Sequence, residues 1–158
     1  MPEKLIGIVL NVRKYNDRNN IVTVYSRFHG RLSFISPIGS GKAGNARRAR
    51  LQPLAVISSE FTFKAGQELQ RLGSISLEEV WNDIYFDPVK RLFSVFISEF
   101  LYRLLNATME DESLWDFILN SLRYLDYQKE KIKDFNFPFL VSLLSYSGIQ
   151  PDVSGYSP

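Results

Sequence analysis

The sequence contains no cysteine and only one histidine among its 158 residues. The absence of cysteine excludes disulfide bonds, thiolate metal sites and cysteine nucleophiles, and it fits a reducing cytoplasm. No apolar run approaches the length needed to cross a bilayer, and the N-terminal residues lack the pattern of a secretory signal. We therefore expect a soluble cytoplasmic protein without membrane contact, cofactor or metal site.

Charge is distributed unevenly, although the net charge of +2 hides this. Residues 1–75 contain twelve Lys and Arg against four Asp and Glu, whereas residues 76–158 contain seven against thirteen. Hydrophobic residues make up 45% of the chain, which is enough to build one core or two small ones. The asymmetry predicts a front half that faces a polyanion, and chance segregation of solvated charge is the alternative.

The first 80 residues show the two-residue apolar alternation of β-strands, beginning with Ile6, Ile8, Leu10 and Val12 on one side of a first strand. Segments rich in Asn, Asp or Gly separate the runs. Short antiparallel strands would expose their edges unless the sheet closes, so we predict a small five-stranded barrel. The five strands are expected within residues 6–12, 21–25, 32–34, 56–63 and 69–77.

After residue 80 the apolar period becomes that of a helix. Asp87 and Pro88 form a start signal, and Thr108 with Asp111 has the spacing of a capping box before a second helix. The apolar sets of three expected helices lie within residues 93–105, 114–125 and 140–144. We therefore predict an α+β protein, with a β-barrel domain in residues 1–79 and a helical domain in residues 80–158.

Residues 39–50 combine three glycines with four cations and contain no acidic residue. Glycine lets the backbone approach a ligand closely, while Lys and Arg pair with phosphates. Part of the segment could instead form a short helix with Arg47, Arg48 and Arg50 around its surface. A further alternative is a mobile loop whose charges aid solubility.

More cations lie near the predicted strand ends, interleaved with aromatic residues. Proteins that bind single strands combine a basic groove with aromatic faces on which bases stack. Tyr15, Tyr25, Phe28 and Phe34 are candidates, but core packing explains each at least as well and is favoured for Tyr25 and Phe34. The candidate DNA-binding residues are Arg13, Lys14, Arg18, Arg27, Arg31, Lys42, Arg47, Arg48 and Arg50.

Few residues are suited to catalysis. His29 stands where a turn is expected, which favours a turn role over that of a general base. The acidic run 110–112 complements a helix start and needs no metal, and a two-metal nuclease is an alternative without supporting acid spacing. A phosphate-binding loop around Lys42 would need glycine in place of Ser36 and a hydroxyl in place of Ala43. We therefore predict that the protein is not an enzyme.

Several different motifs follow one another along nearly the whole chain, in a specific order and spacing. They are the segments 7–10, 15–17, 21–26 and 51–53, the basic segment 39–50, and then 87–89, 98–105, 116–122 and 148–151. Together they resemble the bacterial recombination-mediator family RecO. The resemblance implies an OB-fold barrel followed by a helical domain.

The resemblance also implies a role in recombinational DNA repair through the RecF pathway, in the cytoplasm and associated with the nucleoid. Such proteins bind single- and double-stranded DNA, anneal complementary strands and contact RecR and the acidic tail of single-stranded DNA-binding protein. With RecR they help to load RecA onto coated strands. Candidate contacts for the acidic tail are Lys90, Arg91, Arg103 and Arg123.

The sequence departs from the family pattern in two ways. Many members carry a four-cysteine zinc site in the C-terminal domain, and the residues after Pro151 contain no cysteine. Members also continue well past 158 residues, so we expect the helical domain to be incomplete. Because a barrel alone does not choose a ligand, a protein-interaction adaptor or an RNA-binding module is the alternative.

Overall fold

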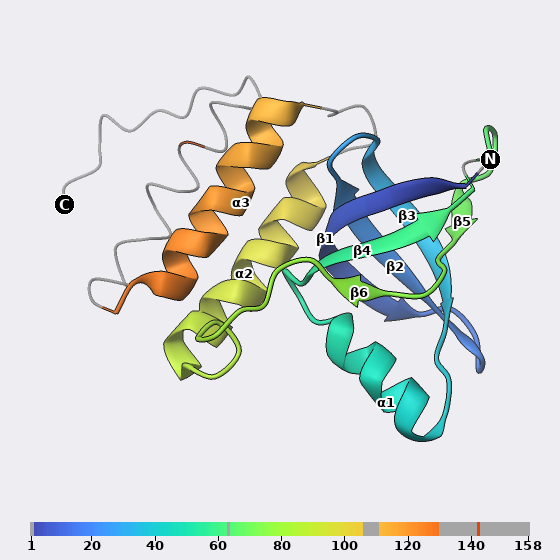
Figure 1. Cartoon of the computed structure of the whole chain (residues 1–158), viewed down its shortest axis with the longest axis horizontal. Helices are drawn as coiled ribbons and strands as arrows, with labels where there is room; N and C mark the ends of the chain where they lie inside the picture. Colours follow the sequence, from blue (N-terminus) through green and yellow to red (C-terminus); the bar gives the residue numbers. More distant parts are fainter. Residues whose placement is uncertain (1, 63, 106–110, 130–141, 143–158) are drawn as a thin grey trace.

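A computed structural model describes residues 2–62, 64–105, 111–129 and 142 of the chain. In Figure 1 a β-barrel occupies one side of the molecule, α1 lies at its lower end, and α2 and α3 pack side by side against the barrel. The predicted α+β class is therefore confirmed. The elements are β1 (Glu3–Lys14), β2 (Asn19–Ser26), β3 (Gly30–Pro37), α1 (Gly41–Arg50), β4 (Val56–Phe61), β5 (Leu69–Arg71), β6 (Ser76–Leu77), α2 (Pro88–Leu104) and α3 (Glu112–Tyr127).

The sheet contains six strands in the order β5-β3-β2-β1-β4-β6, one more than predicted. The expected fifth strand is divided: β5 pairs in parallel with β3, and β6 pairs antiparallel with β4. Between them the chain passes close to β4, because a Cβ on Gly73 would lie 2.9 Å from the carbonyl oxygen of Glu60. One continuous segment thus adds a short strand to each edge of the sheet and closes the barrel by crossing the opening between these edges, and such short edge strands offer little for another chain to pair with.

Both faces of β1 are buried. Leu5 and Val9 belong to the core inside the barrel, whereas Ile8 and Leu10 belong to the core shared with the helices. The apolar side of β1 that the sequence predicted, which includes Ile8 and Leu10, is therefore the outer face of the barrel. The helices α2 and α3 cover this face. Val12 falls outside this pattern and is 37% exposed, beyond a register shift between Val9 and Asn11.

The barrel and the helices share one apolar core. Its barrel side includes Tyr25 and Leu54, and its helical side includes Leu101 and Trp115. The indole N–H of Trp81, in the segment that leads into α2, donates to the carbonyl oxygen of Leu54 at 2.9 Å. Such continuous packing holds the helices in a fixed position on the barrel.

Acidic side chains begin both long helices. Asp87 accepts hydrogen bonds from the backbone N–H groups of the first turn of α2, and Pro88 follows as predicted. Asp111 itself is the N-cap of α3. The sequence predicted Thr108 as the cap, with Asp111 three residues inside the helix, and this prediction is wrong. Thr108 lies outside the described residues, as does the third predicted helix apart from residue 142.

A buried ion pair fastens α2 to the segment before it. Lys90 is 1% exposed, and its ammonium group donates to Asp83 at 3.1 Å and to the carbonyl oxygen of Asp126 at 3.0 Å. The carboxylate of Asp126 in turn accepts hydrogen bonds from the backbone N–H groups of residues 82–84. Every buried charge here therefore has partners, as burial requires.

This cluster predicts a loss of stability in acid. Hydrogen bonds from Lys129 and Lys90 hold the pKa of Asp83 below its ordinary value. Because the folded-state pKa is the lower one, the stabilisation is complete above the unfolded pKa of about 4 and is lost as pH falls through the folded pKa. Urea unfolding from neutral to acid pH should show a smaller decline for Asp83→Asn than for the native chain. Parallel curves for the two proteins would contradict this assignment.

Candidate nucleic-acid interface

Exposed cations gather at one end of the barrel, where the β1–β2 turn meets the end of β3. The backbone N–H of Ile38 donates to the carbonyl oxygen of Arg18 at 2.9 Å, and Arg48 donates to the carbonyl oxygen of Ile38 at 3.2 Å. Arg71 on β5 stands opposite Ile35 on β3. We use the term basic surface for the exposed residues Arg13, Lys14, Arg18, Lys42, Arg48 and Arg71.

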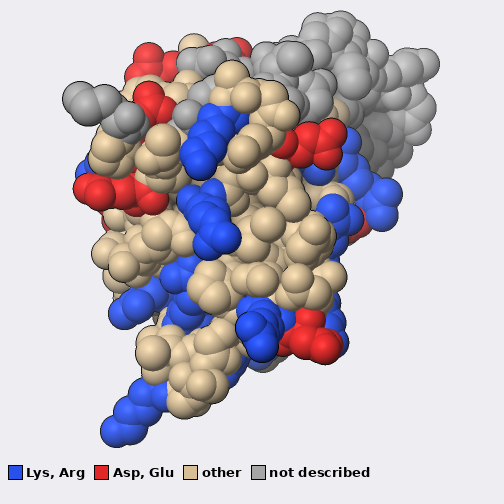
Figure 2. Space-filling model, turned by 90° about the vertical axis from the view of Figure 1, so that its right-hand side faces the viewer, with Lys and Arg blue, Asp and Glu red and all other residues tan. Residues whose placement is uncertain are grey.

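Figure 2 views the molecule from the barrel side, away from α2 and α3. Lys and Arg side chains run down the middle of this face, and Asp and Glu side chains lie towards its margins. Such an arrangement produces a positive potential that attracts a polyanion. The cations of the basic half thus contribute to this face of the barrel.

The glycine-rich segment forms α1, so the short-helix interpretation is confirmed. Gly39 has a φ of +72°, a region that side chains other than glycine rarely adopt. A Cβ on Gly44 would lie 2.7 Å from the carbonyl carbon of Gly39. These two glycines pack against each other, so at these two positions glycine serves the packing of α1 rather than the close approach of a ligand that the sequence suggested. Lys42 and Arg50 lie exposed at opposite ends of the helix.

Arg47 has a structural role that the sequence does not reveal. Its guanidinium group donates to the hydroxyl of Ser36 at 2.8 Å and to the carbonyl oxygens of Gly73 and Leu72 at 3.2 and 3.3 Å. Burial lowers the pKa of this guanidinium from its ordinary value. Arg47 therefore ties α1 to β3 and to the segment between β5 and β6, and all three of its nitrogens donate within the fold.

Arg27 and Arg31 lie at the other end of β2 and β3, away from the basic surface. Arg31 donates to the carbonyl oxygens of Tyr102 and Leu105 at the C-terminal end of α2, with its guanidinium carbon 4.3 Å from the centre of the Tyr102 ring. Arg27 pairs with Glu112 at 3.5 Å. Both residues connect the barrel to the helices, so the nine predicted DNA contacts do not form one surface.

The four predicted partner contacts do not converge either. Lys90 is buried, and this corrects its expected role, because its ammonium group cannot reach a partner. Arg103 pairs with Glu99 at 2.6 Å, and Arg123 pairs with Glu79. Arg91 is exposed and has no ion pair within the described residues.

The aromatic candidates separate by burial. Tyr25 and Phe34 are 1% and 0% exposed, which confirms the preference for core packing. Tyr15, in the turn beside the basic surface, is 53% exposed and can offer a ring face to a base. Phe28 is 48% exposed but lies with Arg27 at the opposite end.

Arg71 is a surface cation that the sequence analysis missed. It reaches the basic surface only through the parallel pairing of β5 with β3. No local sequence signal predicts this pairing, because β5 and β3 are separated by α1 and β4. The only sign of it in the sequence is its place among the twelve cations of the basic half.

Metal ligands, membrane spans and the single histidine can be located only in the described part of the chain. No group of three or more His, Asp or Glu side chains there could hold a metal ion. None of the helices there is long and apolar enough to cross a membrane. His29 lies in the β2–β3 turn, where its ring packs edge-on against Phe61 and its Nε2 lies 3.6 Å from the Glu3 carboxylate.

Comparison with known proteins gives consistent matches. The family model described as "Recombination protein O N terminal" matches residues 1–81, and the model "Recombination protein O C terminal" matches residues 85–155. The chain is 33% identical to the DNA repair protein RecO of Bacteroides fragilis over 99% of its own length and 64% of the relative. It is 30% identical to the DNA repair protein RecO of Phocaeicola vulgatus, over 99% of this chain and 65% of the relative. It is 32% identical to that of Porphyromonas gingivalis, over 93% of this chain and 61% of the relative. The chain thus spans a little under two thirds of the relatives it matches.

Proposed function

Since the chain belongs to the RecO family of DNA repair proteins, we propose that it binds DNA through the basic surface and catalyses no reaction. The observation that supports this most directly is the grouping of exposed cations at one end of a closed barrel. Arg13, Arg18, Lys42 and Arg71 form no hydrogen bond or ion pair through their side chains within the described residues. Their charges are therefore available to phosphates.

The contacts that this surface offers are to the DNA backbone. Lys and Arg side chains neutralise phosphates without reading the bases, so binding is sequence-independent and strongly dependent on salt. The exposed ring of Tyr15 adds one stacking position next to the cations. A surface of this kind accepts single strands and duplexes, as an annealing protein must.

In the cell, this activity would serve as a mediator step of the RecF pathway in the cytoplasm. The protein would anneal complementary strands and, together with RecR, assist the loading of RecA onto strands coated by single-stranded DNA-binding protein. Family membership supports this role. Arg91 and Arg103, which flank exposed apolar residues of α2, and Arg123 on α3 are the remaining candidates for contact with the acidic tail of the coating protein.

Fluorescence anisotropy of a labelled single-stranded oligonucleotide, measured over a range of salt concentrations, tests DNA binding. We expect the logarithm of the association constant to fall linearly with the logarithm of the salt concentration, with a slope of about −3 if about four phosphates are neutralised. A duplex of the same length should bind with a similar dependence. If anisotropy stays constant even in dilute buffer, the proposal is wrong, and RNA or protein ligands become the alternatives to examine.

A further inference from the structure

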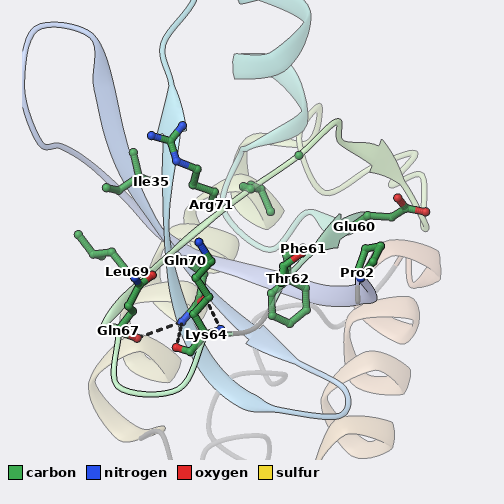
Figure 3. Close-up of a pocket in the computed structure, with 12 residues that line it drawn as sticks. Pro2, Ile35, Glu60, Phe61, Thr62, Lys64, Gln67, Leu69, Gln70 and Arg71 are labelled. Carbon is green, nitrogen blue, oxygen red and sulfur yellow. Dashed lines mark hydrogen bonds between the residues drawn. The ribbon is translucent and has the colours of Figure 1, made fainter.

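A pocket of about 720 Å³ opens beside the connection between β4 and β5. Figure 3 shows it between the end of β4, with Phe61 and Thr62, and the chain from Lys64 to Arg71, with Ile35 of β3 nearby. Its size lies within the range of sites for small ligands. The lining residues are Pro2, Ile35, Glu60, Phe61, Thr62, Lys64, Gln67, Leu69, Gln70, Arg71, Leu72 and Gly73.

One wall of the pocket is held in place by a buried glutamine. The side-chain amide of Gln70, 3% exposed, accepts a hydrogen bond from the backbone N–H of Lys64 and donates to the carbonyl oxygens of Lys64 and Gln67 (Figure 3). The backbone N–H of Gln67 also donates to the carbonyl oxygen of Lys64. A ligand therefore meets a wall that is already ordered, and binding loses less conformational entropy.

The chemistry of the lining suits a flat, partly apolar group that carries a phosphate. The half-buried Ile35 and Leu69 supply apolar contact. Phe61 also lines the pocket, although its side chain is almost completely buried. Lys64 and Arg71 are exposed cations without an ion pair in the described part of the chain, and Glu60 is the only acid in the lining. Arg71 also belongs to the basic surface, so pocket and surface are continuous.

We propose that this pocket takes one unstacked base of a single DNA strand whose phosphates follow the basic surface, an inference that rests on the proposed function. A base in a duplex is paired and stacked, and it can enter only after an unstacking step that costs a few kcal/mol. The pocket therefore adds affinity for single strands and frayed ends but not for an intact duplex. This difference directs the protein to the regions where annealing begins.

Thr62→Trp tests the pocket, because this exposed side chain lines it and makes no hydrogen bond within the described residues. Filling the space should weaken single-strand binding about tenfold, because the base loses its contacts with Ile35 and Leu69, and should leave duplex binding within about twofold. Val80→Trp is the matched control, because Val80 is 68% exposed and does not line the pocket. Thermal unfolding confirms that both variants are folded.

A short cytosine strand with a central 2-aminopurine gives a direct reading of the base. Its fluorescence should rise on binding to the native chain and to Val80→Trp, as the base leaves its neighbours, but not on binding to Thr62→Trp. Lys64→Ala, a change at the exposed rim outside the basic surface, should reduce the single-strand preference if Thr62→Trp fails to fold. Equal losses for single strand and duplex, or no loss, would overturn the inference while DNA binding stands. Absence of binding by the native chain would overturn the proposed function as well.

Discussion

Replacing Trp115 with alanine is expected to lower the free energy of unfolding by about 3–5 kcal/mol and to destabilise the barrel together with the helices. Trp115 is 1% exposed, and its ring lies 6.1 Å from that of Tyr25 on β2. Both residues belong to the core that α2, α3 and the outer face of β1 share. Removal of the indole leaves a cavity at the contact between barrel and helices, so neither part keeps its packing.

Denaturant unfolding followed by circular dichroism and by intrinsic fluorescence gives the measurement. The two probes should report one transition that moves to lower denaturant concentration in Trp115→Ala. Tyr127→Ala is the control on the same helix, because Tyr127 is 81% exposed and its loss should change stability by less than about 0.5 kcal/mol. A barrel signal that unfolds independently of the helices would show that the shared core does not couple them.

Reversal of two charges on the basic surface, Arg18→Glu with Lys42→Glu, is expected to weaken single-strand binding about 100-fold at moderate salt. Each exposed cation can make a charge-assisted contact with a phosphate, and about 1.4 kcal/mol at each of the two positions gives this factor. The slope of the salt dependence should also become shallower by about 1.4, since two phosphates are no longer neutralised on a single strand. Neither side chain has a partner within the described residues, so the fold should be unaffected.

Arg91→Glu with Arg103→Glu is the matched control for this pair. It changes the net charge by the same amount, but both residues lie on α2 rather than on the basic surface. The exposed pair of Arg103 with Glu99 is lost in this variant, which costs only about 0.5 kcal/mol of stability. Its affinity and salt slope should stay close to those of the native chain. Equal losses for the two double variants would mean that overall charge, and not the basic surface, governs binding. Arg47 is unsuitable for such a test, because its reversal would also break the contacts that hold α1.

Local sequence patterns predicted the parts of the fold that depend on neighbouring residues. The two-residue alternation located the first four strands, and Asp87 with Pro88 marked the start of α2. The basic character of the sheet-forming half followed from composition, whereas the helix of residues 41–50 was only one of three alternatives that the sequence left open. These features could be predicted because strand alternation, helix capping and charge density act within a few residues of the chain.

The roles of individual charged residues could not be predicted in this way. Arg31, Arg47 and Lys90 looked like surface cations, yet each donates to carbonyl, hydroxyl or carboxylate oxygens of other elements of the fold. Arg71 looked unremarkable and lies on the basic surface. Whether a cation faces solvent or an internal acceptor depends on long-range pairing.

The amino-acid sequence by itself determined the class of the fold, the family and the positive character of the front half. Only the tertiary structure decided which cations stay free for a ligand, how residues 69–77 close the barrel, and that the outer face of β1 joins the helical core. The physical reason is that backbone periodicity is a short-range property, whereas burial and hydrogen-bond partners arise from contacts between segments that fold together.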